Sequence, residues 1–113
     1  MIFTMDIGNT NIKTGLFQGK ELVRYWRLST NRSSTSDEYG MLVTNLFRSA
    51  GLSPDQVTGI MLSSVVPPVN FTIEHMCNDY FGIAPKFVVP GVKTGINIQY
   101  DNCLLYTSDA ADD

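Results

Sequence analysis

The chain begins with the sequence MIFTMDIGNTNIKTGLF, residues 1–17, and this stretch decides the fold. Residues 1–7 are mostly apolar and close on an acid and an isoleucine, a composition typical of a buried strand. Residues 11–17 predict a second strand, one face of which carries Ile12, Thr14 and Leu16. Between the two strands stands Gly8-Asn9-Thr10, a combination typical of a tight turn. We therefore predict an antiparallel β-hairpin.

A third strand is expected directly after this hairpin. Gln18-Gly19-Lys20 is a second turn signal, and residues 21–29 after it are rich in aromatic and aliphatic side chains. Alternation along this segment predicts one face with Leu22, Trp26 and Leu28 and the other with Val23 and Tyr25. Three antiparallel strands in sequence form a meander.

A helix is predicted to follow a polar connection. We expect residues 31–36 to be mobile, and the helix to run from Ser36 to Gly51. The Ser36 side chain can cap free amides, and two acids follow it at the positive end of the helix dipole, Asp37 and Glu38. Apolar residues recur at helical spacing, namely Leu42, Val43, Leu46, Phe47 and Ala50. Residues 53–56 are expected to add one further turn.

The remaining elements complete an α/β pattern. Residues 59–66 are apolar or small and end at Pro67-Pro68, which predicts a buried parallel strand. A second helix is expected from about Asn70 to Phe81, with Gly82 ending it and an inward face of Ile73, Met76, Cys77, Tyr80 and Phe81. Residues 85–89 predict a short strand. The order of elements predicts a mixed sheet with flanking helices.

Composition narrows the class of protein. The 113 residues suit one small domain, and 43% hydrophobic residues suit a packed core. Net charge is −3 and the eight basic residues are scattered, so we do not expect nucleic-acid binding. No apolar run approaches the roughly 18 residues of a membrane span, and no signal peptide is visible, so we expect a cytoplasmic protein. Two cysteines, Cys77 and Cys103, indicate neither a disulfide framework nor a metal site.

The turn of the first hairpin carries the chemistry. A carboxylate at the end of a buried strand, such as Asp6, needs a role that offsets its desolvation, for example holding hydrated Mg²⁺. Gly8 permits close approach of the backbone to a ligand, and Lys13 adds a positive charge. Amides and a hydroxyl around the turn come from Asn9, Thr10 and Asn11. These residues predict a phosphate site; an ordinary Gly-Asn hairpin with a solvated aspartate is the alternative.

The complete string resembles a family motif. Asp6-Ile7-Gly8-Asn9-Thr10 followed by Gly15-Leu16-Phe17 resembles the first phosphate motif of type III pantothenate kinases. These kinases belong to the actin, Hsp70 and sugar-kinase superfamily, whose domains have a ribonuclease-H-like fold. Three further segments resemble the family in order, namely residues 26–30 (WRLST), 63–68 (SSVVPP) and 95–102 (GINIQYDN). The resemblance implies a ribonuclease-H-like N-terminal domain over residues 1–102.

The resemblance also implies site residues and an activity. The ATP-phosphate loop would comprise Asp6, Ile7, Gly8, Asn9, Thr10, Asn11, Ile12 and Lys13. Asp6 would lie near the transferring phosphate and hold the metal through water, and Tyr100 would contact pantothenate, unless it is simply a strand residue that packs on the sheet. The reaction would be ATP-dependent phosphorylation of pantothenate, the first step towards coenzyme A. The implied cofactors and partners are ATP, Mg²⁺, K⁺ or NH₄⁺, and a second copy in a homodimer.

The sequence departs from the family after residue 102. Cys103 stands where the family has a proline, and the Gly-x-Asp-Arg motif expected next, with the general base and a substrate-binding arginine, does not follow. Asp101 belongs to the preceding segment and is not that base. We expect residues 103–113 to be a tail outside the family domain, either artefactual, disordered or naturally divergent. Without the base and a second domain, we expect this chain to be catalytically inactive.

Other candidates have simpler interpretations. The pair Ser63-Ser64 is expected to shape the floor of the cleft rather than to act as a nucleophile, and His75 to be a plain surface or half-buried histidine. Two other functions remain open, a different phosphotransferase of the superfamily, such as a sugar or acetate kinase, and a non-catalytic regulatory protein. Residues 95–102 argue against the other phosphotransferases, and a reading frame with the Gly-x-Asp-Arg motif would separate kinase from regulator.

Overall fold

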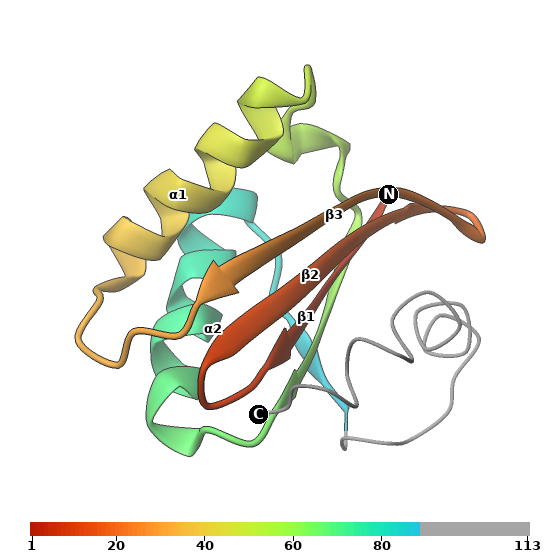
Figure 1. Ribbon diagram of the computed structural model, residues 1–113. Coiled ribbons are helices and arrows are strands. Elements are labelled where there is room, and N and C mark those ends of the chain that lie inside the picture. Colours follow the sequence, from red (N-terminus) through yellow and green to blue (C-terminus); the bar gives the residue numbers. More distant parts are fainter. Residues whose placement is uncertain (89–113) are drawn as a thin grey trace.

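A computed structural model of the chain describes residues 1–88, which form a five-stranded mixed sheet with two helices (Figure 1). The strands lie in the order β3-β2-β1-β4-β5. The β1/β2 and β2/β3 pairs are antiparallel, and the β1/β4 and β4/β5 pairs are parallel. The elements are β1 (Ile2–Ile7), β2 (Asn11–Gln18), β3 (Glu21–Ser29), α1 (Ser36–Ser49), the 3₁₀ turn η1 (Pro54–Gln56), β4 (Gly59–Ser64), α2 (Pro67–Phe81) and β5 (Lys86–Phe87). The predicted α/β class, the N-terminal meander and the internal position of β4 are confirmed.

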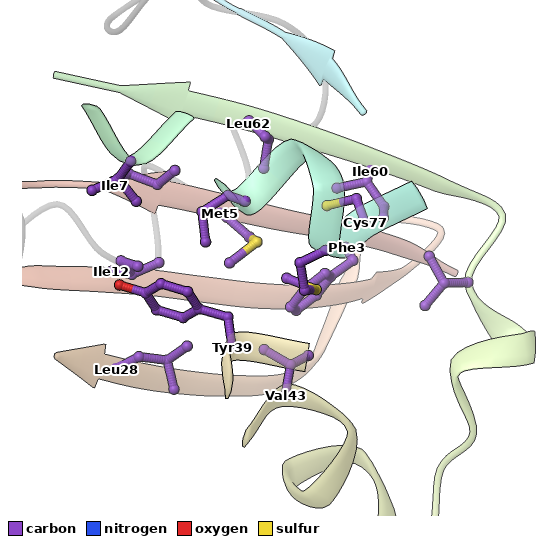
Figure 2. Packing of buried hydrophobic residues seen from close by; sticks show 14 of the residues in the cluster. Phe3, Met5, Ile7, Ile12, Leu28, Tyr39, Val43, Ile60, Leu62 and Cys77 are labelled. Carbon is purple, nitrogen blue, oxygen red and sulfur yellow. The ribbon is translucent and has the colours of Figure 1, made fainter. Parts of the chain in front are cut away.

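Both helices pack on one face of the sheet. Alternate residues of β1 and β2 point to this face, and the buried cluster joins them to α1, β4 and α2, as Figure 2 shows for Phe3, Met5, Ile7, Ile12, Leu62 and Cys77. Cys77 is fully buried, and this burial raises the pKa of its thiol to about 12. A buried thiol with so high a pKa is chemically inert, so Cys77 is a packing residue.

A cluster of aromatic side chains packs the helices against the sheet. The fully buried ring of Phe47 lies at the centre, with ring centroids 5.4 Å from Phe3, 5.3 Å from Trp26 and 5.5 Å from Phe81. These rings come from α1, β1, β3 and α2. Edge-to-face and stacked arrangements at such separations add to the apolar burial. Phe47 therefore joins side chains from four elements in one core.

The faces of β3 differ in part from the prediction. Trp26 and Leu28 face the main core as expected, but Leu22 packs with Phe17 and Tyr25 on the other side of the sheet. The cause is an irregularity in the β2/β3 register, where Leu16 pairs with Arg24 but Phe17 pairs with Leu22. One extra residue in β3 reverses the direction of every side chain before it.

α1 begins at Ser36 as predicted, but its capping residue and the start of α2 differ from the prediction. Thr35, not Ser36, is the N-cap of α1, and it forms a capping box with Glu38 in which the two hydrogen bonds measure 3.1 and 2.8 Å. α2 begins at Pro67 rather than near Asn70, because proline suits the first helical positions. Within residues 1–88, no helix is long and apolar enough to cross a membrane.

The last predicted strand is only partly described. Two of its residues, Lys86 and Phe87, pair with β4 in parallel, whereas residues 85–89 were expected. Val89, residues 95–102 with Tyr100, and the predicted tail at 103–113 lie outside the described residues. The expectations for them stay predictions.

The two helices approach closely at Gly40. A Cβ atom placed there would overlap a ring carbon of Tyr80, so only glycine leaves room for that ring. The Tyr80 hydroxyl crosses to α1 and donates to Asp37 Oδ1 at 2.9 Å. The contact therefore combines a close backbone approach with a polar bond between helices.

Tyr80 is expected to titrate above the ordinary range of a tyrosine. Its hydrogen bond to the Asp37 carboxylate raises the pKa of the phenol, and the charges of Asp37 and Asp79 act in the same direction. Because the folded pKa is raised, this stabilisation is complete below the unfolded pKa of about 10 and is lost as the pH rises through the folded value. The pKa of Tyr80 is measured by the difference in tyrosinate absorbance between the wild type and Tyr80→Phe during an alkaline titration. Asp37→Asn should lower the pKa; an unchanged curve in that variant would contradict the assignment.

Candidate phosphate-binding site

The turn between β1 and β2 lies at the end of the sheet where α2 begins (Figure 1). The strands pair as far as Ile7 and Ile12, and the Gly8 N–H donates to the Asn11 carbonyl at 2.9 Å. The side chains at the tip, Asn9 and Thr10, are exposed. The predicted turn thus presents backbone and polar side chains to solvent at one edge of a rigid sheet.

Asp6 and Lys13 lie side by side next to this turn. They are directly opposite each other in the β1/β2 register, and on its other side Asp6 is paired with Ser63 of β4. Cross-strand neighbours point to the same face with Cβ atoms about 5 Å apart. This face is the one away from the helices, since Met5 and Ile7 occupy the core. The sheet therefore brings together a carboxylate, an ammonium and a hydroxyl that lie far apart in the sequence.

The burial of this pair is uneven. The Lys13 side chain is only 2% exposed, whereas Asp6 is partly exposed. A buried ammonium attracts anions more strongly than a surface one, because solvent screens it less. Arg27 of β3 lies opposite Lys13 and continues the row with an exposed guanidinium. A carboxylate, an ammonium and a guanidinium thus follow one another across β1, β2 and β3.

The end of β4 supports the turn from the other side. The Val65 N–H donates to the Ile7 carbonyl at 3.0 Å, and the Ser64 hydroxyl accepts from the Val66 N–H at 3.0 Å. α2 then begins at Pro67, so the positive end of its dipole lies at the same edge as the turn. Ser64 thus shapes the strand-to-helix corner, and the expectation that the serine pair forms a cleft floor stays a prediction.

The segment after β3 contacts the turn, which the sequence did not predict. The Thr30 N–H donates to the Thr10 carbonyl at 2.9 Å, and the Thr30 hydroxyl donates to the Gly8 carbonyl at 2.7 Å. Arg32 Nη2 donates to Asn9 Oδ1 at 3.1 Å. The available signal was topological, because a three-stranded meander returns the end of its third strand to the first turn.

The metal-binding potential of the site rests on Asp6. Residues 1–88 contain no group of three or more His, Cys, Asp or Glu side chains that could hold a metal. Mg²⁺ in phosphotransferases is commonly held by one or two carboxylates, waters and the phosphates of the substrate, and the partly exposed Asp6 fits that donor set. His75 lies on the exposed side of α2, with Nδ1 3.9 Å from Asp79 Oδ2, as expected for a surface histidine.

Comparison with solved structures identifies the fold. The chain resembles a ROK hexokinase from Thermus thermophilus, with a TM-score of 0.59, 18% identity, and 78% of this chain and 34% of that one covered. It also resembles a putative N-acetylglucosamine kinase from Porphyromonas gingivalis, with a TM-score of 0.56, 12% identity, and coverages of 79% and 33%. These likenesses confirm the ribonuclease-H-like, actin-type fold.

Comparison of sequences identifies the family. The model of the type III pantothenate kinase family matches residues 2–109. A curated type III pantothenate kinase from Brevibacillus brevis is 54% identical over 101 residues, which cover 89% of this chain and 40% of that protein. The chain therefore spans less than half the length of this relative. Because the family model matches most of the chain and a member of the family is 54% identical over 101 residues, this chain belongs to the type III pantothenate kinase family.

Proposed function

We propose that the protein to which this chain belongs transfers a phosphate from ATP to the primary hydroxyl of pantothenate, giving 4'-phosphopantothenate for coenzyme A synthesis. Residues 1–88 would supply the phosphate site. The observation that carries the proposal is the exposed turn between β1 and β2, which we call the phosphate turn, with Asp6 and Lys13 opposite each other beside it. Family membership supports the choice of pantothenate as the acceptor.

The residues around the turn would have different roles in phosphoryl transfer, a reaction that requires mainly positioning and charge neutralisation. Lys13 would balance phosphate charge, and the backbone N–H groups of Gly8 to Asn11 would orient the phosphate oxygens. Asp6 would hold Mg²⁺ through water; the ion, when bound, neutralises charge on the transferring phosphate. The general base is not assigned to any residue from 1 to 88.

The finer assignments complete the proposal. Tyr100 would contact pantothenate. K⁺ or NH₄⁺ would act as a monovalent cofactor, and two copies of the whole protein would form a homodimer in the cytoplasm. No role is proposed for nucleic acids or membranes.

A chimeric enzyme tests the proposal. Residues 1–102 of this chain would replace the matching segment of the Brevibacillus brevis relative, whose remaining length would supply the other parts of the enzyme. We expect ADP release that requires both ATP and pantothenate, and none when glucose replaces pantothenate. An active parent enzyme with an inactive chimera, or a chimera that prefers glucose, would contradict the proposal.

A further inference from the structure

We infer that Thr30 and Arg32 form a second side of the phosphate site, opposite the turn's own residues, in which Thr30 positions the turn and Arg32 binds phosphate oxygens. We call these two residues the second wall. The ligand class is the phosphate chain of a nucleoside triphosphate. The inference rests on the proposed function, because it concerns the same turn. It gives a role to Thr30, which the resemblance included only as the last residue of the segment 26–30, and it adds Arg32, which lies outside the segments that resemble the family.

Thr30 fixes the orientation of two peptide groups in the turn. Its hydroxyl and its N–H donate to the carbonyls of Gly8 and Thr10, at 2.7 and 2.9 Å. In a trans peptide the C=O and the following N–H point in opposite directions, and the described residues contain no cis peptide. Each carbonyl held by Thr30 therefore directs the next N–H, of Asn9 or Asn11, away from Thr30. This orientation presents backbone donors on one side of the turn without rearrangement.

Arg32 brings a positive charge to the tip of the turn. Its Nη2 donates to Asn9 Oδ1 at 3.1 Å, and both side chains are exposed. That bond uses one of the five N–H donors of a guanidinium, and the planar group suits bidentate contacts with phosphate oxygens. The side chain is thus held beside the turn by one bond while further donors remain for a ligand.

The segment that carries both residues is anchored in the core. The Tyr39 hydroxyl donates to the Asn31 carbonyl and accepts from the Asn31 N–H, both at 2.8 Å. Tyr39 is only 2% exposed, and Figure 2 shows its ring near Ile12 and Leu28 with the hydroxyl directed toward the arrowhead end of β3. The first residue of the connection expected to be mobile is therefore bonded to α1. A segment held in this way is pre-organised for binding.

Arg32→Gln tests the charge in the full 113-residue chain. Calorimetric titration with inorganic tripolyphosphate and with ATP at low ionic strength should show about tenfold weaker binding, since hydrogen bonds to charged groups contribute strongly. Adenosine, which has no phosphate, separates binding of the phosphates from binding of the base. Its affinity should be the same for Arg32→Gln and for the wild type. Arg24→Gln is the matched control. Arg24 is exposed like Arg32, but it lies within β3, and its side chain bonds only to the neighbouring Val23 carbonyl among the described residues. This variant should bind tripolyphosphate and ATP as tightly as the wild type does.

Thr30→Val tests the positioning role. It removes the hydroxyl bond and keeps the side-chain shape, so we expect about fivefold weaker binding of tripolyphosphate. Thr30→Ser should restore binding, which a purely steric role of the side chain would not predict. In amide spectra of the labelled chain, tripolyphosphate should shift the Asn9 and Asn11 N–H signals strongly in the wild type and weakly in Thr30→Val.

The outcomes separate this inference from the proposed function. A wild-type chain that binds neither ATP nor tripolyphosphate would contradict the phosphate site itself, and this inference with it. A wild-type chain that binds both, with Arg32→Gln and Thr30→Val binding equally well, would overturn only the second wall. Arg32→Gln alters an exposed side chain, so its result stands even where Thr30→Val fails to fold.

Discussion

Asp6→Ala is expected to lower turnover of the chimeric pantothenate kinase by about a hundredfold or more. Asp6 is the only acid that the register places beside both the phosphate turn and Lys13 within the described residues. Its loss would remove the carboxylate that positions the metal on the transferring phosphate, and losing one well-placed electrostatic group commonly has an effect of this size. Steady-state ADP release with saturating pantothenate measures it, and circular dichroism reports whether the fold persists.

Two further variants control for this result. His75→Ala alters an exposed residue of α2 and should leave turnover unchanged. Tyr100→Ala should mainly raise the KM for pantothenate, since its proposed role is substrate binding. We therefore expect Asp6→Ala to lower kcat far more than His75→Ala or Tyr100→Ala does. The phosphate-turn assignment is wrong if Asp6→Ala stays active while His75→Ala loses activity.

Phe47→Ala is expected to remove a large part of the stability of the fold. The side chain is fully buried and contacts aromatic rings from three other elements. Removing a buried phenylalanine ring lowers the free energy of unfolding by about 3–5 kcal/mol. Domains of this size have total stabilities of only about 5–15 kcal/mol. Urea unfolding followed by circular dichroism measures the difference.

Phe71→Ala is the matched control for that experiment. Phe71 is the same residue type on α2, but it is 69% exposed and packs against the exposed His75 ring. Its truncation should change the free energy of unfolding by less than about 0.5 kcal/mol, as for most surface substitutions. Equal losses for the two variants would show that Phe47 is not the centre of the core.

Much of this fold could be predicted from the sequence because the decisive signals are local. The first hairpin follows from a turn sequence between two apolar segments. Gly51, with a φ of +76°, marks the end of α1, although the helix stops at Ser49 and Ala50 caps it, two residues before the predicted end. The Asp6 to Lys13 region could be singled out because a carboxylate and a lysine are unusual next to a buried strand. Family membership then followed from four segments in the correct order and is confirmed.

The parts that sequence reasoning missed depend on contacts between distant residues. Nothing near Leu22 indicates the irregularity that turns it to the opposite face, since this depends on how β3 pairs with β2. Tyr39 was left out of the apolar pattern, yet it is buried, while Leu42 in that pattern is 43% exposed. The bonds from Thr30 and Arg32 to the turn join residues twenty or more positions apart. Only the arrangement of the three strands brings them together.

The central position of β1 has a consequence for how the protein acquires its shape. One neighbour of Asp6 lies on the next strand along the chain, whereas the other, Ser63, belongs to a strand that follows α1. Contacts between residues close in sequence form faster, because closing a short loop loses less chain entropy. We expect the meander to form early and β4 to dock later. During synthesis, which proceeds from the N-terminus, the emerging chain would carry a nearly finished β1/β2 turn before the strand that completes its support had left the ribosome.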